Sequence, residues 1–315
     1  MKILISGGAG FIGRHLAIHL SHRRDCSIVV LDNLYRGSIS DPSQTDFSPA
    51  FVHGDIRDRG ILSEIMAGVD IVFHLAAQSN VIGASLDRDY SFSTNVTGTF
   101  NVLSAAEQAG VQKVIFASSR EVYGEQQHFP VPERAELNPK NAYGASKVAG
   151  EAYCRFFRSA GLPVQILRLA NVYGPGDRDR VIPIFIENAL RGEPLVLYGG
   201  DQVLDFVWIG TVLEAFERAM SLDALLESPV NIGSGTGVPI RELAQMVIQQ
   251  TGSKSAITEV PGRPCETRGF IADIQRATEL GLVDRPDSRL NHLDSMIHYS
   301  RVRLNDASRV VANAR

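Results

Sequence analysis

A glycine-rich turn lies between an apolar strand and a helix at the start of the chain. Residues 2–6 form an apolar run of strand length, and four glycines follow within the next seven residues. Ile12, Leu16 and Leu20 then recur at the spacing of one helix face. Glycines let the backbone approach a pyrophosphate closely, and the free amides that begin the helix attract this anion. Because the motif lies directly between a strand and a helix, it predicts a dinucleotide site. The residues expected there are Gly7, Gly10, Phe11, Ile12 and Gly13.

The second expected strand, residues 27–31, ends in an acid. Asp32 lies about 20 residues after the last glycine, where a carboxylate binds the adenosine ribose hydroxyls of a dinucleotide. A carboxylate repels a 2′-phosphate, so Asp32 and the adjacent Asn33 predict NAD as the cofactor in preference to NADP. Arg36 nearby could soften this preference, and an ordinary turn aspartate is the alternative interpretation of Asp32.

Further cofactor candidates follow the next strands. Residues 37–50 read as a loop, and the short strand after it ends at Asp55 and Ile56. Asp55 is expected to bind the adenine amine, although a loop-capping role is nearly as well supported. The apolar run from residue 70 ends in Leu75, Ala76 and Ala77, which are small enough to let a flat cofactor lie close. Asn95 lies on a helix expected over residues 92–109.

Polar residues cluster at the end of a central strand. Residues 113–117 form an apolar run that leads into Ser118-Ser119-Arg120-Glu121, and open α/β sheets do chemistry at this end of their strands. Tyr143 and Lys147 then lie four residues apart on one helix face. A protonated amine beside a phenol lowers the pKa of the phenol and prepares it for proton transfer. Alone, the pair could be an ordinary surface contact; with the glycine motif and Ser119 it indicates a catalytic site.

The alternation of strands and helices is regular up to residue 174 and weaker afterwards. It predicts an α/β fold, namely a Rossmann-like doubly wound parallel sheet with a smaller C-terminal substrate-binding lobe. We expect residues 1–174 to form a NAD-binding domain, with 205–232 returning to it. Residues 175–204 and 233–315 would form the lobe.

Two details of this division are specific enough to test. Asp205 to Ile209 is expected to be a strand that returns to the main sheet. After a last short helix over Asp273 to Leu280, the tail from about Asp306 is polar and is expected to fray.

Composition excludes several classes of protein. The formal net charge is −4, which gives no indication of binding to nucleic acid or to an anionic membrane. No apolar run is long enough to cross a bilayer. Cys26, Cys154 and Cys265 are far apart, so they predict neither a metal site nor a disulfide framework and favour a reducing cytoplasm.

Together these motifs resemble the extended short-chain dehydrogenase/reductase family, which includes nucleotide-sugar epimerases and dehydratases. The resemblance runs from Met1 to about Leu282. Besides the residues above, it rests on 171–175 (Asn-Val-Tyr-Gly-Pro), 205–207 (Asp-Phe-Val), 231–233 (Asn-Ile-Gly) and Arg263-Pro264.

The resemblance implies a role for each site residue. The partners would be NAD and a nucleotide-diphosphate sugar, and the enzyme would be a homodimer. Tyr143 would take the proton of the sugar C4 hydroxyl as hydride passes to NAD. Ser119 would share this proton, and Lys147 would bind the nicotinamide ribose and lower the pKa of Tyr143. The substrate would be held by Ser79, Asn171, Arg178, Arg263 and Glu266.

The chain departs from the family pattern in three places. Leu204 stands where the family usually has arginine, and Cys265 replaces a usual glycine. The third departure is Arg120-Glu121. The 4,6-dehydratases carry Asp-Glu at these positions, and the nucleotide-sugar decarboxylases also keep the glutamate.

Glu121 guides the choice of reaction. Oxidation at C4 makes the C5 hydrogen acidic, and a carboxylate there can remove it before the C6 hydroxyl leaves. Alternation in an extended strand would put Ser119 and Glu121 on the same face. We therefore expect a dehydratase that acts on a UDP-hexose or UDP-N-acetylhexosamine. A 4-epimerase of such sugars is the alternative, and a non-catalytic NAD-sensing protein on this fold is a remote one.

Overall fold

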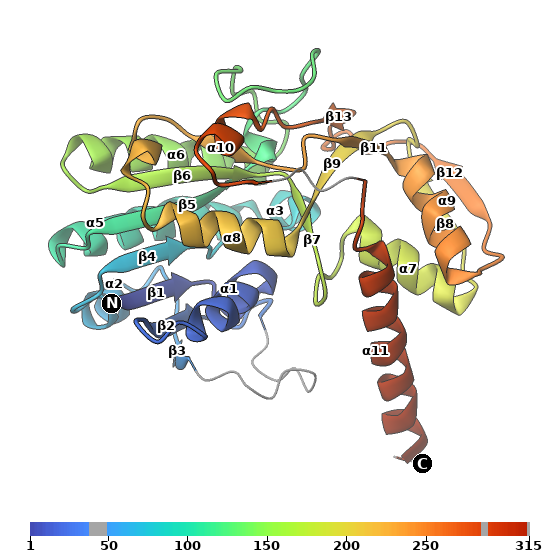
Figure 1. Cartoon of the computed structure of the whole chain (residues 1–315), viewed down its shortest axis with the longest axis horizontal. Helices are drawn as coiled ribbons and strands as arrows, with labels where there is room; N and C mark the ends of the chain where they lie inside the picture. Colours follow the sequence, from blue (N-terminus) through green and yellow to red (C-terminus); the bar gives the residue numbers. More distant parts are fainter. Residues whose placement is uncertain (38–48, 285–288, 314–315) are drawn as a thin grey trace.

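The computed structural model describes residues 1–37, 49–284 and 289–313, so the loop expected over 37–50 lies almost entirely outside the described residues. Within them, parallel strands form a seven-stranded main sheet in the order β10-β6-β5-β4-β1-β2-β3 (Figure 1). The strands are β1 (Lys2–Ser6), β2 (Ser27–Asp32), β3 (Ala50–His53), β4 (Ile71–His74), β5 (Lys113–Ser119), β6 (Val164–Leu169) and β10 (Val230–Ile232).

Helices cover both faces of this sheet. Alternate residues of β1 belong to different cores: Ile3 and Ile5 pack with α1 and α8, whereas Leu4 packs with α2, α5 and α6. The helix bounds are α1 (Phe11–Ser21), α2 (Arg59–Ile65), α5 (Thr99–Gln108), α6 (Ala142–Ser159) and α8 (Ile209–Ala219). The predicted Rossmann-like, doubly wound sheet is thus confirmed.

The helix expected over residues 92–109 is interrupted. α3 (Val81–Leu86) and α4 (Arg88–Phe92) lead into η1 (Ser93–Gly98), a π-helical segment that continues into α5. At Gly98 a side chain would collide with Ile56, because an added Cβ would lie 2.4 Å from the Ile56 Cδ1. The π-helical segment η1, whose turn is wider than that of an α-helix, thus lies where the helix packs tightly against the chain that follows β3.

A second sheet and a separate two-stranded sheet form the core of the smaller lobe. β9 pairs with β7, β11 and β13, while β8 pairs with β12. The strands are β7 (Asn171–Tyr173), β8 (Leu195–Tyr198), β9 (Val203–Trp208), β11 (Gly237–Pro239), β12 (Ile257–Val260) and β13 (Gly269–Phe270). The helices are α7 (Val181–Arg191) and α9 (Ile240–Thr251), with the short η3 (Asp223–Leu226) and α10 (Gln275–Glu279) elsewhere.

The prediction that Asp205 to Ile209 returns to the main sheet is wrong. Only Ala170 separates β6 from β7, so the chain leaves the main sheet there and offers β7 as a partner for β9. The strand that returns to the main sheet is β10, which pairs with β6.

The expectation of a frayed tail from about Asp306 is also wrong, because α11 (Leu293–Asn313) continues beyond that residue. Leu293, Met296, Ile297 and Ser300 are buried, and their spacing marks one helix face that packs on the lobe. Figure 1 shows α11 in dark red, extending away from the two sheets. Neither α11 nor any other helix in the described part of the chain combines the length and apolar character needed to span a bilayer.

Candidate active site

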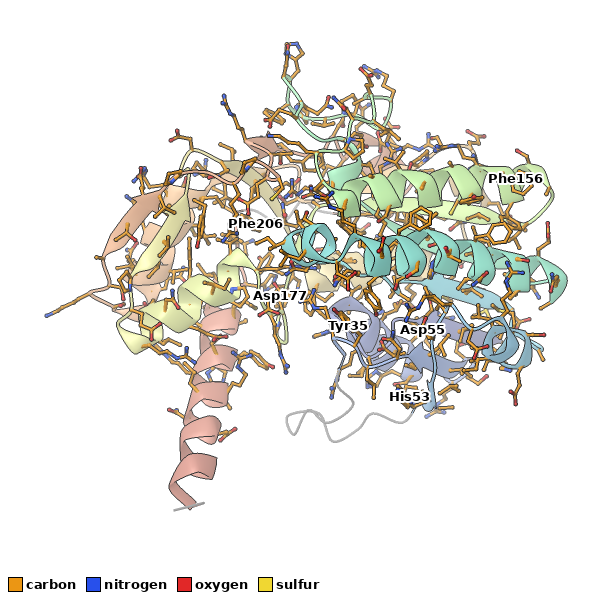
Figure 2. All side chains as sticks on the ribbon, turned by 180° about the vertical axis from the view of Figure 1, so that it is seen from behind. Tyr35, His53, Asp55, Phe156, Asp177 and Phe206 are labelled. Atoms are coloured by element: carbon orange, nitrogen blue, oxygen red, sulfur yellow. The ribbon has the colours of Figure 1, made fainter. Side chains whose placement is uncertain are left out.

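A cavity of about 710 Å³ lies at the carboxyl ends of the main-sheet strands and reaches the smaller lobe. Its walls come from the start of α1, from the segments that follow β2, β4, β5 and β7, and from α7 and β9. Figure 2 shows Asp177 and Phe206 between the main sheet and the lobe. Both residues line the cavity, which therefore joins the two parts of the chain.

The glycine motif forms one wall of the cavity and fits a dinucleotide. Gly7 has a φ of +74°, and a Cβ there would lie 2.6 Å from the amide nitrogen of Ala76. On Gly13, a Cβ would lie 2.2 Å from the carbonyl oxygen of Gly7. Helix α1 begins after Gly10 with no side-chain cap and no acid in its first turn, so its amides are available to an anion.

Asp32 lies beside this wall. Its carboxylate accepts hydrogen bonds from the amides of Ala9 (3.0 Å) and Leu34 (2.8 Å). Burial raises the pKa of Asp32, although these amides oppose the shift. Arg36 forms an ion pair with Asp179 at 3.1 Å. The other cofactor candidates that line the cavity are Gly10, Phe11, Ile12, Asn33, Ile56, Leu75, Ala76 and Ala77.

Two cofactor candidates do not line the cavity. Asp55 accepts hydrogen bonds from Asn33 and Arg57, which outweigh the effect of burial and lower the pKa of Asp55 to about 2. The loop-capping interpretation of Asp55 is therefore the one that its contacts support. Asn95 accepts from the amide of Gln78 at 2.7 Å and donates to Ser146 at 2.8 Å, so it ties η1 to neighbouring segments.

Strand β5 does not continue past Ser119, so the expected alternation through Glu121 is wrong. Arg120, Glu121 and Val122 form a short 3-10 turn, η2 (Arg120–Val122), and the Ser119 hydroxyl oxygen accepts the Glu121 amide at 3.2 Å. A serine that caps a turn in this way ends the strand. Ser119 and Glu121 nevertheless both line the cavity.

The carboxylate of Glu121 is held on both oxygens. Oε1 lies 2.8 Å from Nη2 of Arg120, and Oε2 accepts a hydrogen bond from Nδ2 of Asn141 at 2.7 Å. Arg120 also donates to Oδ1 of Asn171 (3.1 Å) and to the hydroxyl of Thr267 (2.9 Å). The side chains of Glu121 and Arg120 are only 8% and 13% exposed, so this ion pair is largely shielded from water.

Tyr143 and Lys147 both line the cavity from α6, but they are not hydrogen-bonded to each other. Lys147 donates to the carbonyl of Ala117 at 2.7 Å, and burial lowers the pKa of Lys147 to about 8. Burial also raises the pKa of Tyr143 to about 12, opposed chiefly by the positive charge of Arg180 and a hydrogen bond with Ser119. The expectation that Lys147 is what lowers the pKa of Tyr143 is therefore not met in this arrangement.

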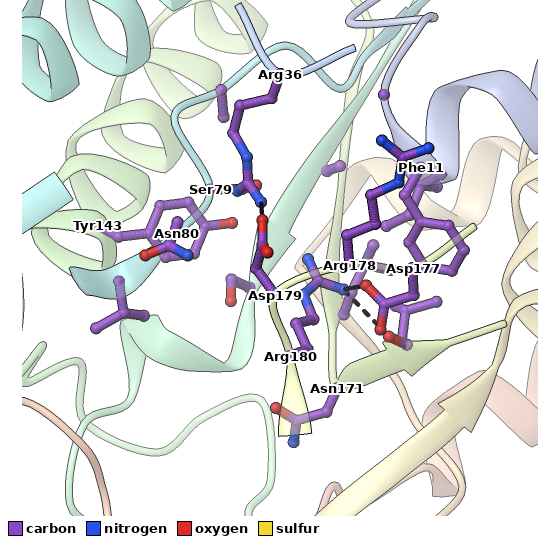
Figure 3. A pocket seen from close by; sticks show the side chains of 18 of the residues that line it. Phe11, Arg36, Ser79, Asn80, Tyr143, Asn171, Asp177, Arg178, Asp179 and Arg180 are labelled. Carbon is purple, nitrogen blue, oxygen red and sulfur yellow. Dashed lines mark hydrogen bonds and ion pairs between the residues drawn. The ribbon is translucent and has the colours of Figure 1, made fainter. Parts of the chain in front are cut away.

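All the substrate candidates line the cavity, Ser79 from the segment after β4 and the other four from the lobe side. They are Ser79, Asn171, Arg178, Arg263 and Glu266, and the departures Leu204 and Cys265 line it too. Figure 3 shows Ser79, Asn171 and Arg178 around the same space as Tyr143. Arg263 pairs with Glu266 at 3.0 Å and lies 3.6 Å above the ring centre of Tyr198.

Sequence reasoning named Arg178 in the loop that follows β7 but missed its charged neighbours. Figure 3 shows Asp177 and Arg180 facing each other in the cavity, and their closest charged atoms are 3.6 Å apart. Burial raises the pKa of Asp177 to about 6. The signal was present as a run of four alternating charges directly after Gly176, whose φ is +84°. A turn that presents charges at the end of a strand is a common form of binding loop.

Comparison with known proteins agrees with this geometry. The model of the NAD dependent epimerase/dehydratase family matches residues 3–233. The chain is 37% identical over 290 residues to a putative UDP-glucose 4-epimerase from Methanocaldococcus jannaschii, covering 89% of this chain and 92% of that protein. It is 36% identical over 287 residues to a UDP-N-acetyl-alpha-D-glucosaminuronate decarboxylase from Bacillus cytotoxicus, covering 85% and 86%.

Solved structures agree as well. The dTDP-glucose 4,6-dehydratase DesIV from Streptomyces venezuelae, solved with NAD bound, superimposes with a TM-score of 0.89 at 33% identity and covers 96% of this chain and 97% of its own. The residues matched by the family model include the glycine motif, Ser119 and the α6 pair Tyr143 and Lys147. The chain therefore belongs to the NAD dependent epimerase/dehydratase family, and its cofactor is NAD.

Proposed function

We propose that this chain is a nucleotide-sugar 4-epimerase that acts on a UDP-hexose or UDP-N-acetylhexosamine. The sequence led us to expect a dehydratase of the same sugars. We favour the 4-epimerase because both carboxylate oxygens of Glu121 already have partners, an ion pair with Arg120 and a hydrogen bond from Asn141. A dehydratase needs a free base at C5 and an acid for the leaving C6 hydroxyl, whereas a 4-epimerase needs neither.

The residues that would hold NAD are those of the glycine wall and Asp32. The tight backbone packing that Gly7 and Gly13 allow and the uncapped start of α1 suit a pyrophosphate-binding turn. The carboxylate of Asp32 would accept the adenosine ribose hydroxyls. When bound, NAD would accept a hydride from C4 of the sugar and return it.

Tyr143 would accept the proton of the C4 hydroxyl. Because burial raises the pKa of Tyr143 to about 12, the phenolate needs nearby positive charge and a hydrogen-bond donor. Arg180 supplies charge and Ser119 supplies the hydrogen bond. Lys147 would bind the nicotinamide ribose from the same helix. A non-catalytic NAD sensor has no need for this set of groups.

The nucleotide diphosphate would bind on the lobe side of the cavity. Arg178 and Arg263 carry the charge and the planar donors that suit phosphate oxygens. Asn171 and Ser79 add neutral hydrogen-bonding groups, and Glu266 positions Arg263 through their 3.0 Å ion pair. Leu204 lines the cavity where the family usually offers another arginine, so one phosphate contact would be missing.

The groups around C5 support epimerisation. An acid must give up a proton, and the guanidinium of arginine does not do so in proteins. Arg120 therefore cannot replace the acid that dehydratases carry at this position. Arg120 holds one oxygen of Glu121 and Asn141 holds the other, so the carboxylate would have to leave both partners before it could take a C5 hydrogen. The 4-keto sugar would then keep its C5 hydrogen, rotate and take the hydride back on its other face.

Incubation with a panel of UDP-hexoses and UDP-N-acetylhexosamines, followed by mass spectrometry and NMR, tests this proposal. We expect one substrate to keep its mass and to equilibrate between two C4 epimers. A product lighter by one water would overturn the 4-epimerase. Heat-denatured protein is the matched control for non-enzymatic loss of water.

The 4,6-dehydratase or 5,6-dehydratase remains the second candidate. Glu121 lines the cavity two residues after Ser119, where it is available if substrate binding releases it from Arg120. The same panel separates the two candidates, because elimination removes water and inversion does not.

We also infer a homodimer that forms through an aromatic surface on α5 and α6. Phe100, Tyr153 and Phe156 are joined there by a series of ring contacts that runs through the buried Phe157. Phe156 is 61% exposed, which is unusual for such a large apolar side chain. Figure 2 shows Phe156 far from Asp177 and hence from the cavity, so a second copy could cover it without closing the site.

A reducing compartment such as the cytoplasm suits the cysteines. Cys26, Cys154 and Cys265 are all free thiols, and Cys154, on α6, is buried in the core. A chain of this kind gains nothing from an oxidising environment. Fractionation of the native cells would test this inference.

A further inference from the structure

Arg120 connects three separate parts of the active site. Its Nη2 pairs with Glu121, its Nε donates to Asn171 on β7, and its Nη1 donates to Thr267 in the lobe. Every nitrogen of the guanidinium thus has a partner on this chain. The acceptor on Asn171 is itself oriented, because the other end of that amide donates to the carbonyl of Asp205 at 2.9 Å. The guanidinium is therefore fixed in position.

The second partner of Glu121 is fixed in the same way. Asn141 caps α6 by accepting the amide of Gly144 at 2.8 Å, which leaves its Nδ2 to donate to Glu121 and to the carbonyl of Cys265. Glu121 is thus held between a charged donor, Arg120, and a neutral donor, Asn141, whose other hydrogen bonds fix its orientation. Of these two donors, only Arg120 carries a charge, and its guanidinium lies 2.8 Å from the carboxylate.

The cavity places this pair where it can affect a 4-keto sugar. Arg120, Glu121, Ser119 and Tyr143 all line the same space. A carboxylate beside a ketone at C4 could break the C5–H bond, take the proton and leave the electron pair in an enolate on the C4 oxygen. Returning a proton from water to C5 would complete an exchange that needs no other acid.

We propose that Arg120 is a specificity-determining positioning residue that keeps Glu121 from acting as the C5 base. This inference rests on the proposed 4-epimerase function. It assigns to Glu121 a latent activity that the charge of Arg120 suppresses. The arginine therefore protects the 4-keto intermediate from loss of its C5 proton. Loss of this proton is the first step both of exchange and of the elimination of water.

The test compares the full-length wild type, Arg120→Gln, Arg120→Lys and the double variant Arg120→Gln/Glu121→Gln. Each protein is incubated in deuterated water with UDP-glucose or UDP-N-acetylglucosamine, whichever the wild type inverts. NMR measures inversion at C4 and deuterium at C5. Binding of UDP, measured by calorimetry, verifies that each variant is folded and retains its substrate site.

We expect Arg120→Gln to incorporate deuterium at C5 about tenfold or more faster per inversion than the wild type, since a positioned base contributes on the order of a hundredfold or more. Arg120→Lys keeps the charge and should remain near the wild type. The double variant lacks the carboxylate and should lose the gained exchange. Structural damage alone would not produce C5 exchange in Arg120→Gln that disappears in the double variant.

Each other outcome has a defined meaning. If Arg120→Gln binds UDP but incorporates deuterium at C5 of the sugar no faster than the wild type, Arg120 does not restrain Glu121 and the inference is overturned. An Arg120→Lys variant that exchanges as fast as Arg120→Gln would also overturn it, because charge would not be the cause. Water loss or C5 exchange by the wild type itself would instead refute the 4-epimerase proposal, and the inference with it.

Discussion

The amine of Lys147 donates to the carbonyl of Ala117 at the end of β5, although Tyr143 lies one helical turn away on the same face of α6. The nitrogen is 5.8 Å from the ring centre of Tyr143. Lys147 therefore fixes α6 to the central strand and presents its charge near the phenol without bonding to it. The proposed catalytic pair is thus linked through the sheet rather than by a direct hydrogen bond.

Replacing Tyr143 with phenylalanine should lower turnover by about a hundredfold to ten-thousandfold, because the variant lacks the group proposed to move the C4 proton. UDP-sugar affinity, measured by calorimetry, should stay near the wild type. Tyr153→Phe is a matched control, since Tyr153 lies on the same helix and does not line the cavity. Near-normal turnover by Tyr143→Phe would assign the proton transfer to another group.

Asp32→Asn should weaken NAD binding by roughly tenfold to a hundredfold, the usual cost of losing a hydrogen bond to a charged group. Asp55→Asn is the control, because this carboxylate ends the neighbouring strand yet is bound to Arg57 and Asn33 and does not line the cavity. It should leave the NAD affinity unchanged. Calorimetry with NAD measures both, and equal losses in the two variants would contradict our division of roles.

His74 should destabilise the fold in acid. The ring is completely buried between the hydroxyls of Ser6 (2.7 Å) and Thr99 (2.9 Å), and burial lowers the pKa of His74 to about 3. Between this pKa and the unfolded value near 6.5, the unfolded chain binds more protons, so stability is lost as the pH falls below about 6.5.

The expected loss from His74 is roughly 3 kcal/mol at pH 4 relative to pH 7. Urea unfolding at the two pH values measures the total change, and NMR of the ring reports the titration itself. A ring that protonates near pH 6 in the folded protein would show that burial does not control it.

Phe156→Glu should convert the proposed dimer to a monomer, because a charge at the centre of an apolar contact must lose its water. Val302→Glu is the control, since Val302 on α11 is also exposed, at 45%, and lies on another part of the molecule. Sedimentation velocity distinguishes the two states. A Phe156→Glu protein with the mass of the wild type would place the interface elsewhere or show that the wild type is monomeric.

The features that sequence predicted well depend on local rules. The strand–glycine–helix unit and the spacing of Tyr143 and Lys147 are each set within a few residues, and both agree with the structure. The doubly wound sheet follows from the regular alternation of strands and helices. For the same reason α11 could have been found, because Leu293, Met296 and Ile297 have the spacing of a buried helix face.

The features that sequence missed depend on distant partners. β9 has the pattern of any buried strand, and only its pairing with β7 decides which sheet it joins. Asp55 carries the same carboxylate whether it meets adenine or Arg57. The partner of Lys147 is a backbone carbonyl on β5, which no side-chain pattern reveals. The pairing of Arg120 with Glu121 arises because a turn replaces the expected extended strand.

The single residue between β6 and β7 has a mechanical consequence. The amide of Ala170 is bonded to Ile232 of β10 at 2.9 Å, while Asn171 immediately begins the strand that pairs with β9. The two sheets therefore share a continuous, hydrogen-bonded backbone, with no flexible linker at this crossing. Rotating one half away from the other would break strand pairing. We therefore expect the two halves to keep their relative position when a ligand enters the cavity.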